Sequence, residues 1–153
     1  MSTIIQGNQV RSILFGVRVS KSYAAFAAET ATLFTVTGGK VLVTSLVGEV
    51  TTAITVANTV KLQANPTTGT TKDLCAATDI GTTDTPVGDL LSFQGLTGDS
   101  ILHGPGAVPT LKQPLVINTG TIEQVTTGTG PDGAVTWVLT YVPLDDGAAV
   151  VAA

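Results

Sequence analysis

The stretch 134–142 alternates strictly between two kinds of side chain. The large apolar side chains share one parity: Val135, Trp137, Leu139 and Tyr141. Threonine and valine fill the other parity, and Pro143 follows. Successive side chains of a β-strand point to opposite faces of its sheet, so one face of this strand is expected to lie in a core. Proline has no N–H to donate to a sheet ladder, and it ends the predicted strand.

Similar runs of β-branched and apolar residues recur along the chain, with turn residues between them. The runs are 32–37, 41–50, 58–64, 115–118 and 121–127. Gly38-Gly39 predicts a hairpin between the first two, and Asp132-Gly133 predicts another before the strand at 134–142. The nearly continuous apolar run at 41–50 predicts a central strand covered on both faces. The run at 58–64 alternates as a half-solvated strand does.

About eight strands at this spacing predict an all-β single domain, a β-sandwich or jelly roll over residues 21–153. Residues 1–20 are expected to form a short N-terminal arm or a first strand. Residues 22–31 fit a short helix or an extended chain, and the extended form is favoured, so no helix is expected. Glycines and prolines interrupt 65–114, where short strands joined by ordered loops are expected.

The composition is poor in charge and rich in threonine. Charged residues make up 12% of the 153 residues, which is half the typical share of about 25%. Threonine (27 residues) and glycine (17 residues) take their place. Such a chain is the opposite of a disordered one. The net charge is −4 and the seven basic residues are scattered, so nucleic acid is not expected as a partner.

The hydropathy pattern gives no sign of a membrane segment. No apolar run approaches the roughly 20 residues of a span. The apolar burst at 13–17 is short and has arginine on both sides, which does not match a secretory signal. Synthesis in the cytoplasm, without a membrane partner, is therefore expected.

No set of residues matches a catalytic or metal-binding motif. Cys75 is the only cysteine and His103 the only histidine, and we interpret them as a core residue and a turn residue. Five acidic residues gather in a loop-rich stretch: Asp73, Asp79, Asp84, Asp89 and Asp99. We interpret them, and the pair Asp145-Asp146, as turn residues, with a bound cation as the alternative for the loop-rich stretch. The chain is expected not to be an enzyme and to use no cofactor or metal.

Apolar residues extend into the loops and to both ends of the chain, including 148–153, while charges are too few to cover a surface. Monomers seldom expose large apolar patches, so contact between subunits of a homo-oligomer is predicted.

Three segments together resemble a known group of proteins. They are ATLFTVTGGKVLVTSLVGEVTT from Ala31, LQANPTTGTTKDLCAA from Leu62 and VTWVLTYVPLDDGAAV from Val135. The chain resembles, over roughly residues 24–153, small virion proteins of tailed bacteriophages that serve as head decoration (cement) or minor structural proteins.

The resemblance implies a non-enzymatic β-sandwich or jelly-roll subunit, often a homotrimer, on the outer capsid surface of the virion. Such a protein stabilises the capsid by bridging copies of the major capsid protein. It commonly has an N-terminal arm that reaches onto the lattice, for which residues 2–19 are the candidate here. The candidate capsid-contact residues are Ile4, Ile5, Val10, Arg11, Ile13, Leu14, Phe15 and Arg18.

Three alternatives stay open at this point. The same fold can serve as a tail or head-fibre subunit of a phage. The chain can instead be a glycan- or ligand-binding β-sandwich module that binds through the loops at 66–110. An enzyme that uses His103 with one of the aspartates is the third hypothesis.

Overall fold

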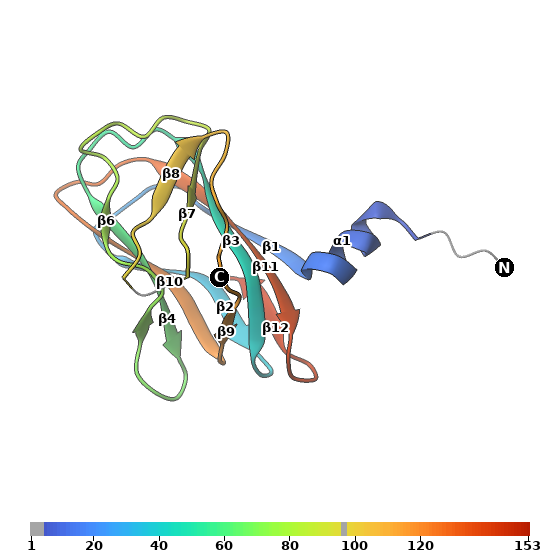
Figure 1. Ribbon diagram of the computed structural model, residues 1–153. Coiled ribbons are helices and arrows are strands. Elements are labelled where there is room, and N and C mark those ends of the chain that lie inside the picture. Colours follow the sequence, from blue (N-terminus) through green and yellow to red (C-terminus); the bar gives the residue numbers. More distant parts are fainter. Residues whose placement is uncertain (1–4, 96–97) are drawn as a thin grey trace.

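The alternating stretch forms β11 (Ala134–Pro143), a strand near the centre of one of two six-stranded antiparallel sheets. A computed structural model describes residues 5–95 and 98–153. The two sheets stack as a sandwich (Figure 1). The expected all-β sandwich is confirmed.

Within residues 5–95 and 98–153 the structure has one short helix and twelve strands. They are α1 (Gly7–Phe15), β1 (Val17–Tyr23), β2 (Thr30–Thr37), β3 (Val41–Thr52), β4 (Thr59–Pro66), β5 (Lys72–Asp73), β6 (Thr78–Asp79), β7 (Asp89–Ser92), β8 (Leu102–Pro105), β9 (Leu115–Ile117), β10 (Gly120–Thr127), β11 and β12 (Ala149–Ala152). Sheet A has the order β1-β11-β3-β7-β8, with β9 also paired to β3. Sheet B has the order β12-β2-β10-β4-β5, with β6 also paired to β4.

The core lies between the sheets, and the predicted face of β11 points into it. All four large side chains of that face are at most 5% exposed. Trp137 also joins the two sheets: its indole N–H donates to Gln124 Oε1 on β10 at 2.8 Å. Gln124 Nε2 donates in turn to Thr126 Oγ1 at 2.9 Å, so both the oxygen and the nitrogen of the buried side-chain amide have a hydrogen-bond partner. A buried polar group needs such partners, because water cannot replace them.

Both predicted hairpins are wrong, because the chain crosses from one sheet to the other at each turn. β2 and β10 belong to sheet B, whereas β3 and β11, which follow them, belong to sheet A. At the first crossing, Gly38 has φ +73°, and a Cβ there would lie 2.2 Å from the carbonyl oxygen of Gly147. At the second, the Asp132 carboxylate accepts hydrogen bonds from the N–H groups of Thr55 (2.9 Å) and Val56 (2.8 Å). These turns are shaped by contacts with distant loops and not by a strand partner.

Three further expectations need correction. The strand at 41–50 is central, but only one of its faces is fully buried; the other is partly exposed and carries the exposed Glu49. The apolar C-terminal segment 148–153, which was counted among the surfaces for subunit contact, pairs with β2 of its own chain through β12 and buries Val150 in the core. A helix, which was not expected, forms at 7–15 within the predicted N-terminal region.

The outer face of sheet B is polar and satisfies its own hydrogen bonds. At its centre the buried Glu123 carboxylate accepts hydrogen bonds from Gln63 (2.7 Å), Asn65 (3.0 Å) and Thr121 (2.6 Å). Burial raises the pKa of Glu123, but the three hydrogen bonds favour the ionised form and bring its pKa below the ordinary value of 4.5. The polar side chains at the centre of this face are thus hydrogen-bonded to one another.

We expect Glu123→Gln to lower the free energy of unfolding at pH 7 by about 1 kcal/mol, because the amide loses charge-assisted hydrogen bonds. The pKa of Glu123 is lower in the folded than in the unfolded chain. Its stabilisation is thus present above the unfolded value and is lost as the pH falls through the folded value. Urea unfolding between pH 7 and pH 3 should show a smaller acid destabilisation in the variant, and an unchanged pH dependence would contradict the assignment.

Candidate functional site

Helix α1 projects from the sandwich instead of packing onto it (Figure 1). None of its residues is buried. Gln9 Oε1 accepts the backbone N–H of Gln6 at 2.9 Å and so satisfies one free N–H at the helix start. The helix ends at Gly16, and Thr44 of β3 donates a hydrogen bond to the carbonyl of Phe15 at 2.8 Å. The helix is thus fixed at its C-terminal end and free along its length.

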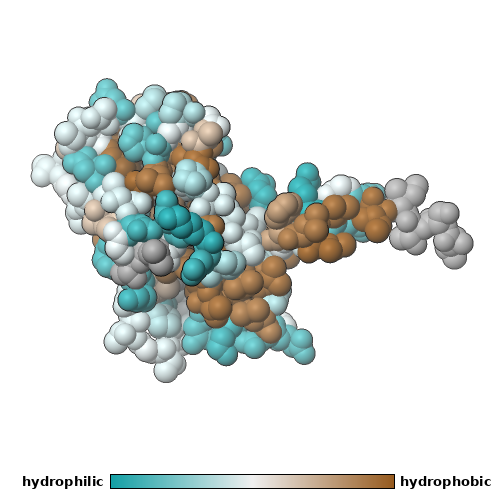
Figure 2. Space-filling model, in the orientation of Figure 1, coloured by the Kyte–Doolittle hydropathy of each residue, from teal (hydrophilic) through white to brown (hydrophobic). Residues whose placement is uncertain are grey.

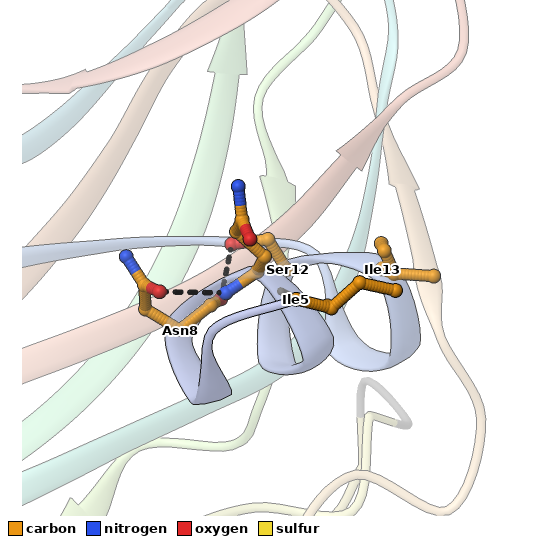
Figure 3. Close-up of a pocket in the computed structure, with 5 residues that line it drawn as sticks. Ile5, Asn8, Ser12 and Ile13 are labelled. Atoms are coloured by element: carbon orange, nitrogen blue, oxygen red, sulfur yellow. Dashed lines mark hydrogen bonds between the residues drawn. The ribbon is translucent and has the colours of Figure 1, made fainter. Parts of the chain in front are cut away.

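One side of α1 is an exposed apolar stripe, which we define as Val10, Ile13 and Leu14. Their spacing of three and four residues places them on the same side of the helix. The exposed fractions are 41%, 75% and 68%. Ile5 precedes the helix and lines a shallow hollow of about 450 Å³ together with Ile13 (Figure 3). No other part of the described chain covers the stripe.

The opposite side of α1 forms one wall of a groove of about 610 Å³. The helix contributes Arg11 and Phe15 to this groove, and sheet A contributes Arg18, Thr44 and Thr140. No acidic residue lines the groove, and neither arginine takes part in an ion pair within the described part of the chain. The groove therefore combines two unpaired guanidinium groups with an aromatic ring and hydroxyl groups.

An apolar row lies on the outer face of sheet A, close to the base of α1. The row consists of Val116, Leu42 and Val142, which are direct neighbours on β9, β3 and β11. Val116 is 61% exposed and Val142 38%. In Figure 2 the brown surface of the helix continues onto the adjoining end of the sandwich. The outer face of sheet A thus exposes an apolar row, whereas the outer face of sheet B is polar at its centre and exposes Val151 on its edge strand β12.

The structure places the predicted contact residues in two groups. Ile5 and the apolar stripe form an uncovered ridge, whereas Arg11, Phe15 and Arg18 line the groove. Ile4 lies outside the described residues. The groove wall from sheet A and the apolar row were not predicted, because both depend on which strands are neighbours.

Of the residues weighed as catalytic or metal-binding, the structure brings His103 close to one aspartate, Asp89. His103 lies on β8, not in a turn, and its Nδ1 is 3.6 Å from Oδ2 of the buried Asp89. Asp79 forms a turn, as predicted, since its carboxylate accepts hydrogen bonds from Gly81 and Thr82. Asp73 and Asp89 lie on the strands β5 and β7 instead, so their interpretation as turn residues is wrong. In residues 5–95 and 98–153, no three His, Cys, Asp or Glu side chains form a group that could hold a metal ion.

Cys75 is fully buried, which confirms its interpretation as a core residue. Burial raises the pKa of its thiol to about 11, so the thiol stays protonated at neutral pH. A protonated, inaccessible thiol is a poor nucleophile.

The comparisons with known proteins gave no match to a protein-family model, a curated protein or a solved structure. Within the described residues, no helix has the length and apolar character needed to cross a bilayer.

Proposed function

We propose that the chain is a structural protein of a tailed-bacteriophage virion, a decoration (cement) protein of the capsid. It binds the outer surface of the assembled head as a homo-oligomer and stabilises the shell by bridging major capsid subunits. The observation that carries the proposal is the apolar stripe of α1, which is held away from its own sandwich. The resemblance of the three sequence segments supports the phage assignment.

The helix is suited to binding a groove on another protein. An amphipathic helix binds by placing side chains at positions i, i+3 and i+4 in an apolar groove. Val10, Ile13 and Leu14 have this spacing, and burying each of the larger two is worth about 1.5–3 kcal/mol. Because α1 is fixed at Gly16 and Phe15, it can hold the sandwich at a defined position above the bound surface.

The proposal assigns no catalysis and no cofactor to the chain. The single histidine faces a buried aspartate across β7 and β8, and that pair is 3.6 Å apart. A general base needs a nucleophile or a substrate proton within hydrogen-bond reach. No hydroxyl or thiol donates a hydrogen bond to His103 within the described chain. The histidine thus has the setting of a structural residue on sheet A.

We expect Ile13→Gln/Leu14→Gln to weaken binding to heads by more than about 100-fold, because two apolar contacts are lost. Both side chains are exposed, so the free energy of unfolding should change by less than about 0.5 kcal/mol. The measurement is co-sedimentation of the purified chain with expanded heads that lack it, prepared from the phage that encodes it. Val87→Gln is the matched control, since Val87 is 63% exposed and lies in the loop before β7.

Two results would contradict the proposal. Absence of binding of the unaltered chain to heads would exclude decoration, and binding to isolated tails instead would favour the tail or fibre role. Equal loss of head binding in the Val87 control would show that α1 is not the contact.

A further inference from the structure

The charges of the chain are divided between its N-terminal segment and the rest. None of the 11 acidic residues precedes Glu29, whereas three of the seven basic residues lie in the first 21 positions. Two of these three, Arg11 and Arg18, line the groove between α1 and sheet A. Two like charges in one groove repel each other, and a carboxylate between them would relieve this repulsion.

The groove also offers apolar surface beside its arginines. Phe15 is 60% exposed and Val17 43%, and both line it. The matching ligand therefore has a carboxylate next to an exposed apolar side chain. An Arg guanidinium can bind a carboxylate through two parallel hydrogen bonds, which fixes orientation as well as affinity.

The same chain carries such a segment in the loop between β11 and β12, which we call the acidic tip (residues 144–146). Leu144 is 49% exposed. Asp145 is engaged, since its carboxylate accepts the N–H of Lys40 at 2.7 Å. Asp146 is exposed and forms no ion pair within the described residues. The tip does not line the groove of its own copy.

We propose that the groove binds the acidic tip of a second copy of this chain. Asp146 pairs with Arg11 and Arg18, and Leu144 packs against Phe15 and Val17. The opposite charges of groove and tip select this occupant. Each copy offers one groove and one tip, so the contact can repeat around a closed ring.

This inference rests on the homo-oligomeric part of the proposed function and not on the capsid. The apolar stripe of α1 contributes no residue to the groove, so the two surfaces can be altered separately, although Asn8 and Ser12 line both the groove and the hollow beside Ile5. Self-association through the groove leaves Ile13 and Leu14 free for the lattice.

The test is a charge exchange followed by sedimentation velocity of the purified full chain, without heads, at low and high salt. We expect the unaltered chain to form an oligomer that weakens with salt. Arg18→Glu and Asp146→Arg should each raise the dissociation constant by about tenfold or more. The double variant should restore association to within about threefold of the unaltered chain. Asp84→Arg, the same charge change at another exposed loop, should have no effect.

Three results would overturn the inference. They are a 15.5 kDa monomer at all concentrations, equal weakening by Asp84→Arg, and a folded double variant that does not recover association. Circular dichroism checks that each variant is folded. Head binding by a monomeric chain would refute the groove contact and the homo-oligomeric part of the proposed function, and would leave head decoration standing. Oligomers that do not bind heads would refute decoration and leave the groove contact standing.

Discussion

Trp137→Ala is expected to lower the free energy of unfolding by about 3–5 kcal/mol through lost packing alone. The indole is fully buried and lies over Gly48 on the neighbouring strand, where a Cβ would come within 3.0 Å of the ring. Alanine leaves a cavity in the volume of the indole, and the surrounding side chains can fill this cavity only if the two sheets move. The variant also leaves the Gln124 carbonyl without its donor, which adds about 1–3 kcal/mol. Most small domains are stable by only about 5–15 kcal/mol, so much of the variant should be unfolded.

Urea unfolding followed by far-ultraviolet circular dichroism measures this effect, because the variant lacks the only tryptophan. Trp137→Phe separates the two contributions, since it keeps most of the ring volume and removes the N–H donor. Replacing Gln124 with leucine in the Phe variant should recover part of the stability, because the orphaned carbonyl is then gone. If Trp137→Ala lowered the free energy of unfolding by less than about 1.5 kcal/mol, the indole would not be a major contact between the two sheets.

The faces of individual strands could be predicted from the sequence because their signal is local. The alternation through Trp137 and Leu139 determines which side chains enter the core, whatever the partner strands are. The same holds for Val60 and Leu62 on β4, which are buried while Lys61 between them is partly exposed. Side chains alternate between the two faces of a strand whichever strands are its neighbours, so this alternation can be read without knowing the topology.

The pairing of the strands could not be predicted in this way. Gly38-Gly39 has the composition of a hairpin turn, yet it carries the chain from sheet B to sheet A. The path of the chain at this turn depends on a close approach to the backbone of Gly147. Gly147 is more than one hundred residues away, so the sequence near the turn carries no signal of this contact. Asp132 is likewise held by Thr55 and Val56. Such contacts form only in the finished fold.

The candidate site was predicted in part. The exposed apolar residues of the first 20 positions were recognised, but not their helical form, although Val10, Ile13 and Leu14 have helical spacing. A helix of nine residues is marginal on its own, so its sequence signal is weak. The groove could not be predicted from the helix alone. Its other wall includes Thr44 and Thr140, which lie next to each other only because β3 pairs with β11.

Gly16→Ala is expected to detach α1 and the start of β1 from the sandwich. Gly16 has φ 98° and ψ −171°, a backbone conformation open almost only to glycine. A Cβ there would lie 2.1 Å from the carbonyl oxygen of Tyr141, which belongs to the partner strand and cannot move alone. The strained backbone costs about 1–3 kcal/mol, and relieving the clash costs about 1–3 kcal/mol more. Releasing the helix is the cheaper response, because none of its side chains is buried.

Hydrogen exchange over residues 16–23 should therefore speed up by at least about tenfold in Gly16→Ala, since about 1.4 kcal/mol corresponds to that factor. Exchange in β3 and β10, which lie deeper in the two sheets, should change much less. Gly7→Ala is the matched control: it lies in the same helix with nothing within 4 Å of its Cβ, and it should leave exchange at 16–23 unchanged. The released helix can no longer hold Arg11 beside Arg18, so self-association through the groove should fall together with head binding. Native exchange rates at 16–23 in Gly16→Ala would show that α1 is not held in place at this glycine. The position of α1 would then have to be fixed by the hydrogen bond from Thr44 to Phe15 alone.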